Sequence, residues 1–203
     1  MRIAQLSRTS GVPVATVKYY LRERLLHDGK LTSPTQAQYD ESHVERLRLV
    51  VALLGPGGLS VAAARRVLDA LADPPASTHE LLGVAHHAVL GPPPAEDPDL
   101  TDVCALVHRW GWQVHDQDRA TLAALAVALQ GLADAGFELP AERLDHYARS
   151  MAEVAAVELA ATPTESPEAA VRYVVLGTVL VEPLLLALRR LAQQDASARR
   201  FGR

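Results

Sequence analysis

The chain has 203 residues, of which 49% are hydrophobic and 22% are charged, and we expect this apolar content to bury the core of one large or two small domains. The net charge of −4 argues against a uniformly basic surface, but residues 1–75 carry a net charge of +3 and residues 76–203 a net charge of −7. This asymmetry favours two parts with different partners.

Two short helices joined at Gly11 are predicted at the start of the chain. Ile3, Ala4 and Leu6 give the first helix a small apolar face, and Gly11 can adopt the positive φ that ends it. Pro13 suits the start of the second helix, where its missing N–H costs nothing. The inward face of the second helix is formed by Val14, Val17 and Leu21. Its other faces carry Thr16, Lys18, Tyr19 and Arg22.

A hairpin and two more helices are predicted next. The segment Leu26–Tyr39 contains Asp28-Gly29 and Ser33-Pro34 and has no helical period, which indicates a hairpin-like wing. Apolar residues then recur at three and four positions and predict a third helix, with Val44, Leu47, Val51 and Leu54 on its face. Gly55–Gly58 breaks that helix, Ser60 can cap a fourth helix that runs through Leu71, and Pro74-Pro75 ends the module.

The remainder is predicted to be helical around one Pro-rich linker. A helix is expected over 77–90, and Gly91–Pro98 cannot continue it because proline lacks the N–H donor. After the linker, one helical face carries Leu100, Val103, Cys104, Val107 and Val114. A short seam suited to a partner helix follows, made by Leu122, Leu125, Leu129 and Leu132. Two further helices are expected near 141–160 and 167–196.

The longest apolar stretch is Val174–Leu188, which contains Glu182 and Pro183. It is shorter than the roughly 20 residues needed to cross a bilayer, so we expect a buried core helix that Pro183 kinks, and no membrane partner. The single cysteine, Cys104, excludes an internal disulfide, and no secretory signal is recognised, so a cytoplasmic location is expected.

Residues 1–75 resemble the winged helix-turn-helix of the MerR family of bacterial transcription regulators. The resemblance rests on the run Thr16-Val-Lys-Tyr-Tyr20, the following Leu25-Leu26, the wing and Tyr39. It implies a homodimer that binds a near-palindromic operator and distorts promoter DNA for RNA polymerase. The sequence departs from the family where Lys18 replaces an arginine and where Ala37 replaces a wing arginine.

The resemblance also implies which residues contact double-stranded DNA. Lys18, Tyr19 and Tyr20 would contact the phosphate backbone, while the second helix and the wing set the register and read the shape of the groove. The expected DNA-binding residues are Thr16, Lys18, Tyr19, Tyr20, Arg22, Gln36, Gln38 and Tyr39. Taken singly, a Tyr-Tyr pair on a helix is more often packing, and Lys18 with Arg22 is more often a solvated face. The order of the parts favours the DNA-binding interpretation.

A metal site is not expected. One cysteine cannot supply a thiolate cluster, and the apolar position of Cys104 favours a small core residue. A metal-responsive regulator that uses histidines is an alternative, with His79, His86, His87, His108 and His115 as candidates. Histidines seven residues apart are separated by about 10 Å of helical rise, which is too far for one ion without a third element.

A small organic effector is the preferred hypothesis for the second part. Aromatic side chains with one carboxylate can form an apolar pocket with a charged contact, and the candidates are Trp110, Trp112, Tyr147, Tyr173 and Glu182. The competing interpretation, which is favoured residue by residue, is that the aromatics are core and that Glu182 pairs with Arg172 or Arg189.

These patterns predict a mainly α protein with three parts: a winged helix-turn-helix DNA-binding domain over 1–75 with a small β wing, a connecting helix and linker over 76–98, and an all-α effector-binding and dimerisation domain over 99–203. We expect a transcription regulator that uses no cofactor. An enzyme is not expected because no phosphate-cradling loop, nucleophile motif or metal-ligand cluster is found. The alternative function is a protein that binds or sequesters a drug-like molecule.

Overall fold

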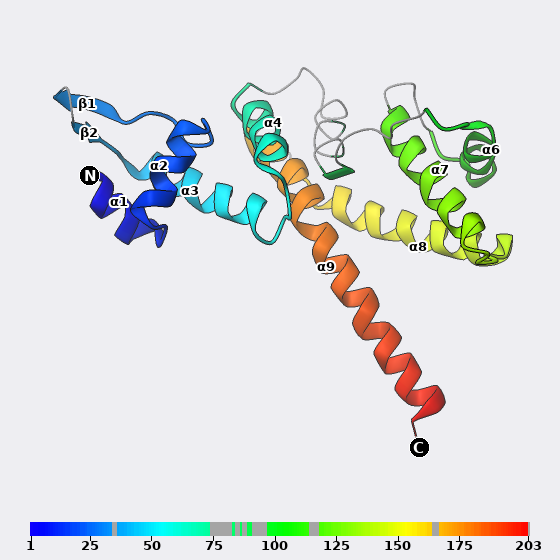
Figure 1. Cartoon of the computed structure of the whole chain (residues 1–203). Coiled ribbons are helices and arrows are strands. Elements are labelled where there is room, and N and C mark those ends of the chain that lie inside the picture. Colours follow the sequence, from blue (N-terminus) through cyan, green and yellow to red (C-terminus); the bar gives the residue numbers. More distant parts are fainter. Residues whose placement is uncertain are drawn as a thin grey trace. The chain divides into compact units, whose positions relative to one another are not determined.

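The computed structural model describes residues 1–33, 36–73, 83, 86, 89–90, 97–113, 118–163 and 167–202, which are mainly helical as predicted (Figure 1). Two compact units are distinguished: Met1–Pro74 together with Leu176–Arg203, called unit 1, and Pro75–Val175, called unit 2. Most of the helix expected over 77–90 and of the linker Gly91–Pro98 lies outside the described residues.

Unit 1 begins with two helices, α1 (Ile3–Ser10) and α2 (Val14–Arg22), joined at Gly11. Gly11 adopts φ 74°, the left-handed conformation that an L side chain rarely tolerates, and so ends α1 as predicted. The Ser10 hydroxyl accepts a hydrogen bond from the Val12 N–H at 3.3 Å and donates to the Leu6 carbonyl at 2.7 Å. The corner is therefore held by its own hydrogen bonds.

The wing is a two-stranded antiparallel hairpin of β1 (Lys30–Ser33) and β2 (Gln36–Gln38), as the sequence predicts. Lys30 pairs with Gln38 and Leu31 with Ala37, and the register shifts before Ser33 pairs with Gln36. The end of the wing is tied back to the start of the chain, because the Tyr39 N–H donates to the Met1 carbonyl at 2.8 Å.

Two capped helices complete the N-terminal part of unit 1. Helix α3 (Glu41–Leu54) is capped by Asp40, whose side chain accepts from the Ser42 N–H, and α4 (Val61–Ala72) is capped by Ser60, which accepts from the Ala63 N–H at 3.2 Å. The predicted Ser60 cap is confirmed. These caps satisfy N–H groups that a helix start leaves without intrahelical acceptors.

The core of unit 1 is made of aliphatic side chains from α1, α2, the loop after α2, α3 and α4. Its fully buried members include Leu6, Val17, Leu25, Leu26, Val44, Leu47, Val50, Leu53, Val67 and Leu68. The predicted face of α3 was partly wrong: Val51 is 42% exposed, and Val50 and Leu53 point inward instead. An all-aliphatic run such as Leu49–Leu54 does not indicate which of its residues face the core.

Unit 2 contains α6 (Thr101–Trp110), α7 (Arg119–Asp134) and α8 (Ala141–Ala160). Val103 and Val107 of α6 are buried against Ala126 of α7, and Leu122, Leu125 and Leu129 pack on the same cluster. The leucine seam therefore meets a helix of its own chain. The prediction that Cys104 is a core residue was wrong, because the buried stripe of α6 is only two valines wide and Cys104 is exposed.

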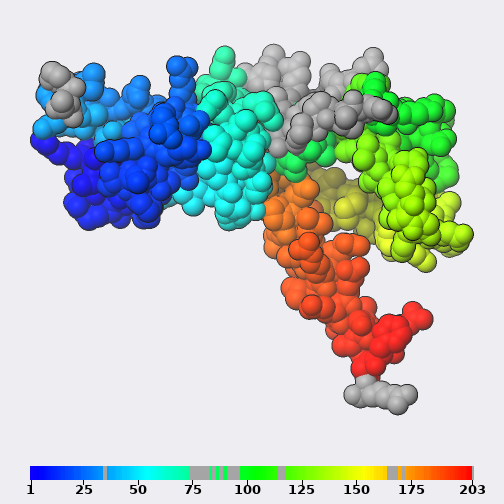
Figure 2. Space-filling view, in the orientation of Figure 1, coloured from blue at the N-terminus to red at the C-terminus, as the bar shows by residue number. Residues whose placement is uncertain are grey.

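The longest helix, α9 (Pro167–Phe201), crosses from unit 2 into unit 1 and continues through Pro183. Val174, Val175 and Val179 are buried, and Val179 lies against Gly57 in the turn after α3. The expectation that Val174–Leu188 is a core helix was wrong beyond Val179, where the exposed apolar residues include Leu184, Leu186, Leu188 and Leu191. Figure 2 shows the orange-to-red half of α9 extending beyond the blue-to-cyan body of unit 1.

No helix in the described part of the chain has both the length and the hydropathy needed to span a membrane.

Gly29, at the entrance of the wing, has no room for a side chain. A Cβ at this position would lie 2.6 Å from the Gln38 carbonyl oxygen and 2.9 Å from the Tyr39 ring. We predict that Gly29→Ala lowers the free energy of unfolding by about 1–3 kcal/mol, the usual cost of overpacking, measured by urea denaturation.

Gly131→Ala is the matched control. Gly131 lies within α7 with no atom near its Cβ position, so alanine should be neutral or stabilise by about 0.5–1 kcal/mol. Equal stability of Gly29→Ala and the parent chain would contradict the described wing geometry.

Candidate nucleic-acid interface

The outer surface of α2 is cationic and aromatic. Lys18 is exposed, Tyr19 is 36% exposed, and the Arg22 side chain is 73% exposed. The Arg22 guanidinium lies 5.3 Å from the centre of the Tyr19 ring, a cation–π distance, and its Nε is 3.7 Å from the Glu23 carboxylate. This surface can donate to phosphate oxygens through an ammonium, a guanidinium and a phenol.

The second tyrosine of the run and the wing tyrosine lie mainly in the core. Tyr20 and Tyr39 are each 8% exposed, and Thr16 is half-buried. Burial, with a smaller contribution from the Asp28 charge, raises the pKa of Tyr39, so its hydroxyl stays a neutral donor. Most of each of these two tyrosine side chains is buried and so stabilises the module. Their contact with DNA stays a prediction.

The wing presents a polar edge. Gln36 and Gln38 are exposed on the same face of β2, and Ala37 between them is half-buried. The register brings Lys30 opposite Gln38, so a cation lies on the wing although β2 lacks an arginine at Ala37. Sequence reasoning missed Lys30, because its place on the wing follows only from the strand register.

Two arginines from other helices hold the end of α2. Arg46 of α3 donates from Nε to the Leu25 carbonyl at 2.9 Å, and Arg65 of α4 donates from Nε to the Glu23 carbonyl at 2.9 Å. Arg65 also reaches the Glu23 carboxylate at 3.3 Å. Burial lowers the pKa of Arg46, partly offset by the charge of Asp69, but a guanidinium remains charged in a protein. Cations near a helix C-terminus can donate to carbonyls that have no partner within the helix, and they interact favourably with the helix dipole.

Arg24 turns the chain from α2 toward the wing. It has φ 56°, the only positive φ of a non-glycine residue in the described part of the chain. The turn is closed by hydrogen bonds from the Arg24 N–H to the Leu21 carbonyl at 3.1 Å and from the Leu25 N–H to the Tyr20 carbonyl at 2.9 Å. The direction of the chain after α2 is therefore set by a left-handed residue and two arginine contacts.

The candidate effector residues are placed on different surfaces. Trp110 and Trp112 form a tilted ring pair with centroids 4.9 Å apart, while Tyr147 and Tyr173 are 49% and 37% exposed. Glu182 is exposed on the part of α9 that belongs to unit 1, so the expected carboxylate within a buried apolar helix was wrong.

Asp145 is a residue that sequence analysis did not single out. Its Oδ1 accepts from Trp110 Nε1 at 2.8 Å and from Arg109 at 2.5 Å, which ties α6 to α8. The hydrogen bond from Trp110, followed by that from Arg109, lowers the pKa of Asp145. No sequence pattern indicates this contact, because its partners lie in different helices.

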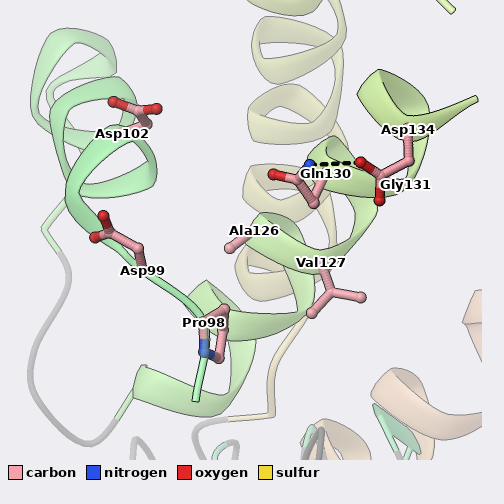
Figure 3. Close-up of a pocket in the computed structure, with 8 residues that line it drawn as sticks. All are labelled: Pro98, Asp99, Asp102, Ala126, Val127, Gln130, Gly131 and Asp134. Carbon is pink, nitrogen blue, oxygen red and sulfur yellow. Dashed lines mark hydrogen bonds between the residues drawn. The ribbon is translucent and has the colours of Figure 1, made fainter. Parts of the chain in front are cut away.

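Two cavities lie among the described residues of unit 2, and none of the five candidate effector residues lines either of them. The first has about 510 Å³ and is shown in Figure 3, with Asp99 and Asp102 on the α6 side and Val127, Gln130 and Asp134 on α7. Gln130 donates to Asp134 at 2.7 Å across its rim. The second, of about 490 Å³, lies around Leu129, Leu132 and Phe137.

Comparison with known proteins identifies the family of this module. The protein-family model described as MerR HTH family regulatory protein matches residues 1–71 of the chain. A crystal structure of a protein assigned as a transcriptional regulator of Streptomyces coelicolor A3(2) is 36% identical, with a TM-score of 0.65, and the alignment covers 100% of this chain and 99% of that one. The chain belongs to the MerR family.

As a MerR-family protein, the chain is a transcription regulator, and its partner is DNA. The comparison with curated protein sequences gave no match. The resemblance of residues 1–75 to the MerR family is thereby confirmed, and the matched residues 1–71 include the first two helices and the wing.

The arginine contacts at the end of α2 can be tested with two adjacent residues. Arg65→Gln removes two hydrogen bonds to Glu23, so we predict a loss of about 1–3 kcal/mol in unfolding free energy together with weaker DNA binding. Arg66→Gln removes the same charge from an exposed neighbour on α4 and should change stability by less than about 0.5 kcal/mol. Equal losses of stability and of DNA affinity in the two variants would show that the effect comes from the charge of the arginine and not from its hydrogen bonds to the end of α2.

Proposed function

We propose that this MerR-family regulator binds operator DNA as a homodimer through the outer face of α2 and the wing of each subunit. The observation that carries this proposal is the exposed set Lys18, Tyr19 and Arg22 on a short helix whose other side is core. A second helix of this kind fits the major groove, and the wing at its flank reaches the backbone. Residues 1–75 are thus the proposed DNA-binding domain.

Within this proposal, the charged and the uncharged side chains make different kinds of contact with DNA. Lys18, Arg22 and Lys30 neutralise phosphates, and Tyr19, Gln36 and Gln38 donate hydrogen bonds that fix the register. Thr16, Tyr20 and Tyr39 reach DNA only through the small parts of their side chains that solvent touches. Bending and untwisting of the promoter would then present it to RNA polymerase, with specificity supplied by the deformability of the DNA.

The DNA contacts are tested with Lys18→Ala and Tyr19→Phe on the DNA upstream of the protein's own gene, using fluorescence anisotropy. Lys18→Ala should weaken binding by about tenfold or more and reduce the slope of log affinity against log salt by about 1 for each subunit on DNA. Tyr19→Phe should weaken binding by about three- to tenfold, because it loses one hydroxyl donor but keeps the ring beneath Arg22.

Arg143→Ala, at an exposed position of α8 in unit 2, removes a cation that is not part of the proposed surface and is the matched control. It should leave the affinity unchanged. Parent-like affinity in both the Lys18 and the Tyr19 variants would sink the assignment of α2 as the contact surface.

The dimer contact is proposed to be the apolar face of α9. Leu184, Leu188 and Leu191 recur at i, i+4 and i+7 and are 54%, 52% and 61% exposed. This spacing is that of a helix face that packs against another helix, and a second copy of α9 supplies the same face by symmetry. The leucines of α7 are less suited to this role because α6 already packs on them.

Leu188→Glu should convert the dimer to a monomer, measured by light scattering after size exclusion, because a carboxylate would be buried without a partner. Gln193→Glu places the same charge at an exposed polar position of α9 on another face and should leave the dimer intact. A Leu188→Glu protein that stays dimeric would exclude this face.

The second unit is proposed to bind a small organic effector and to act without catalysis. Trp110 and Trp112 are the two tryptophans of the chain and lie together, so their emission reports a ligand that binds beside them. Tyr147 and Tyr173 stay candidates that the described contacts do not join to this pair, whereas Glu182 belongs to unit 1. A ligand that shifts the emission and the DNA affinity is an effector, whereas one that shifts the emission alone indicates a sequestering protein.

A further inference from the structure

Three side chains with metal-binding atoms meet at the base of the wing. His27 lies between α2 and β1, Asp40 follows β2, and His43 is in the first turn of α3. One potential ligand atom from each residue lies within 4.8 Å of the other two. The cluster joins both ends of the wing to α3. Sequence reasoning considered only histidines of the second part, because the whole wing separates His27 from His43.

The Nδ1 atom of His43 faces two groups of Asp40 that compete for it. Its Nδ1 lies 3.1 Å from the Asp40 backbone N–H, which donates to it, and 2.7 Å from Asp40 Oδ1. An imidazole nitrogen either accepts through its lone pair or donates a proton, so Nδ1 can accept from that N–H or donate to the carboxylate, but it cannot do both at once.

The other ring nitrogen of His43 is unsatisfied. His43 is 3% exposed, and its Nε2 has no hydrogen-bond partner in the described part of the chain. Buried polar groups without partners are uncommon in folded proteins. The ring is held by packing instead, with the His27 ring centre 3.9 Å away and the Tyr39 ring edge-on at 5.1 Å.

The groups around the cluster are in forms that bind cations. Hydrogen bonds from Ser42 and His43 lower the pKa of Asp40, so its carboxylate is ionised. Burial, followed by the charges of His43 and Arg46, lowers the pKa of His27 and keeps its imidazole neutral. Metals bind imidazole in its neutral form and carboxylate in its ionised form. The negative charges of Asp28 and Asp40 oppose the effect of the positive charge of Arg46 on the pKa of His27.

The donor set selects the kind of ion. Two imidazoles and one carboxylate suit Zn²⁺ and its neighbours Co²⁺ and Ni²⁺ better than Mg²⁺ or Ca²⁺, which prefer oxygen ligands. Three protein ligands with water in the fourth position is an established coordination for Zn²⁺. We propose that His27, Asp40 and His43 bind one divalent ion of the Zn²⁺ class at the base of the wing.

Binding an ion requires small movements of the side chains, and Nδ1 of His43 must exchange the hydrogen bond from the Asp40 N–H for the ion. Ligands about 2.0–2.1 Å from a tetrahedral ion lie about 3.3 Å from one another, so the Asp40–His43 pair must separate slightly while His27 moves inward. His27 and Asp40 are exposed, which gives the ion access from solvent, whereas His43 is fixed in the core. Both exposed side chains contact Ser42, so the ion would compete with these hydrogen bonds. The bound ion would tie the entrance and exit of the wing to α3.

Zn²⁺ binding is measured on the tag-free, chelator-treated full chain by calorimetry, without DNA, so the result is independent of the proposed function. One Zn²⁺ per chain is expected, together with a higher unfolding temperature in its presence and visible absorption from Co²⁺ at the same site. His27→Ala and Asp40→Ser should each weaken binding at least about tenfold. Serine keeps a capping oxygen for α3, so Asp40→Ser tests the ligand rather than the fold.

His146→Ala is the matched control, because His146 is an exposed histidine of α8 in unit 2, and it should bind Zn²⁺ like the parent chain. Absence of saturable Zn²⁺ binding by the parent chain would overturn the proposal and leave a proton as the cation between Asp40 and His43. Equal Zn²⁺ affinity in the parent, His27→Ala and Asp40→Ser proteins would overturn it as well.

Discussion

Arginine side chains that hold the carbonyl end of α2 are the interaction on which the winged module depends. Arg46 binds the Leu25 carbonyl and Arg65 binds the Glu23 carbonyl, each at 2.9 Å, from two helices that follow the wing in sequence. A nine-residue helix is too short to be stable alone, so α2 owes its position to these contacts and to the burial of Val17 and Tyr20. The outer residues of α2 are therefore presented by a fixed support.

The same support fixes the wing. Its first strand follows the left-handed turn at Arg24, and its second strand returns to Tyr39, which packs in the core and pairs with Met1, and to Asp40, which caps α3. Both elements that are proposed to contact DNA thus share one set of anchors. In the proposed binding mode, such preorganisation would leave little rearrangement of the protein, so the interaction energy would be available for deforming the DNA.

The sequence predicted those parts of the fold that depend on local chemistry. Gly11 ends α1, Ser60 caps α4, and the turn residues around Gly29 and Pro34 indicate the wing, since each effect acts within a few residues. The sequence did not predict features that join distant segments of the chain. These are the arginine contacts on α2, the hydrogen bond between Asp145 and Trp110, and the proximity of His27 and His43. The burial of Tyr20 was missed because Tyr, amphipathic by nature, serves equally in a core or at a surface.

The proposal that α2 and the wing of two subunits read one operator can be tested by hydroxyl-radical footprinting of the parent protein on the DNA upstream of its own gene. We expect two symmetric protected patches one helical turn, or a multiple of it, apart, formed in the presence of excess nonspecific DNA and lost as salt rises. A single unpaired patch, or protection that nonspecific DNA abolishes, would contradict it.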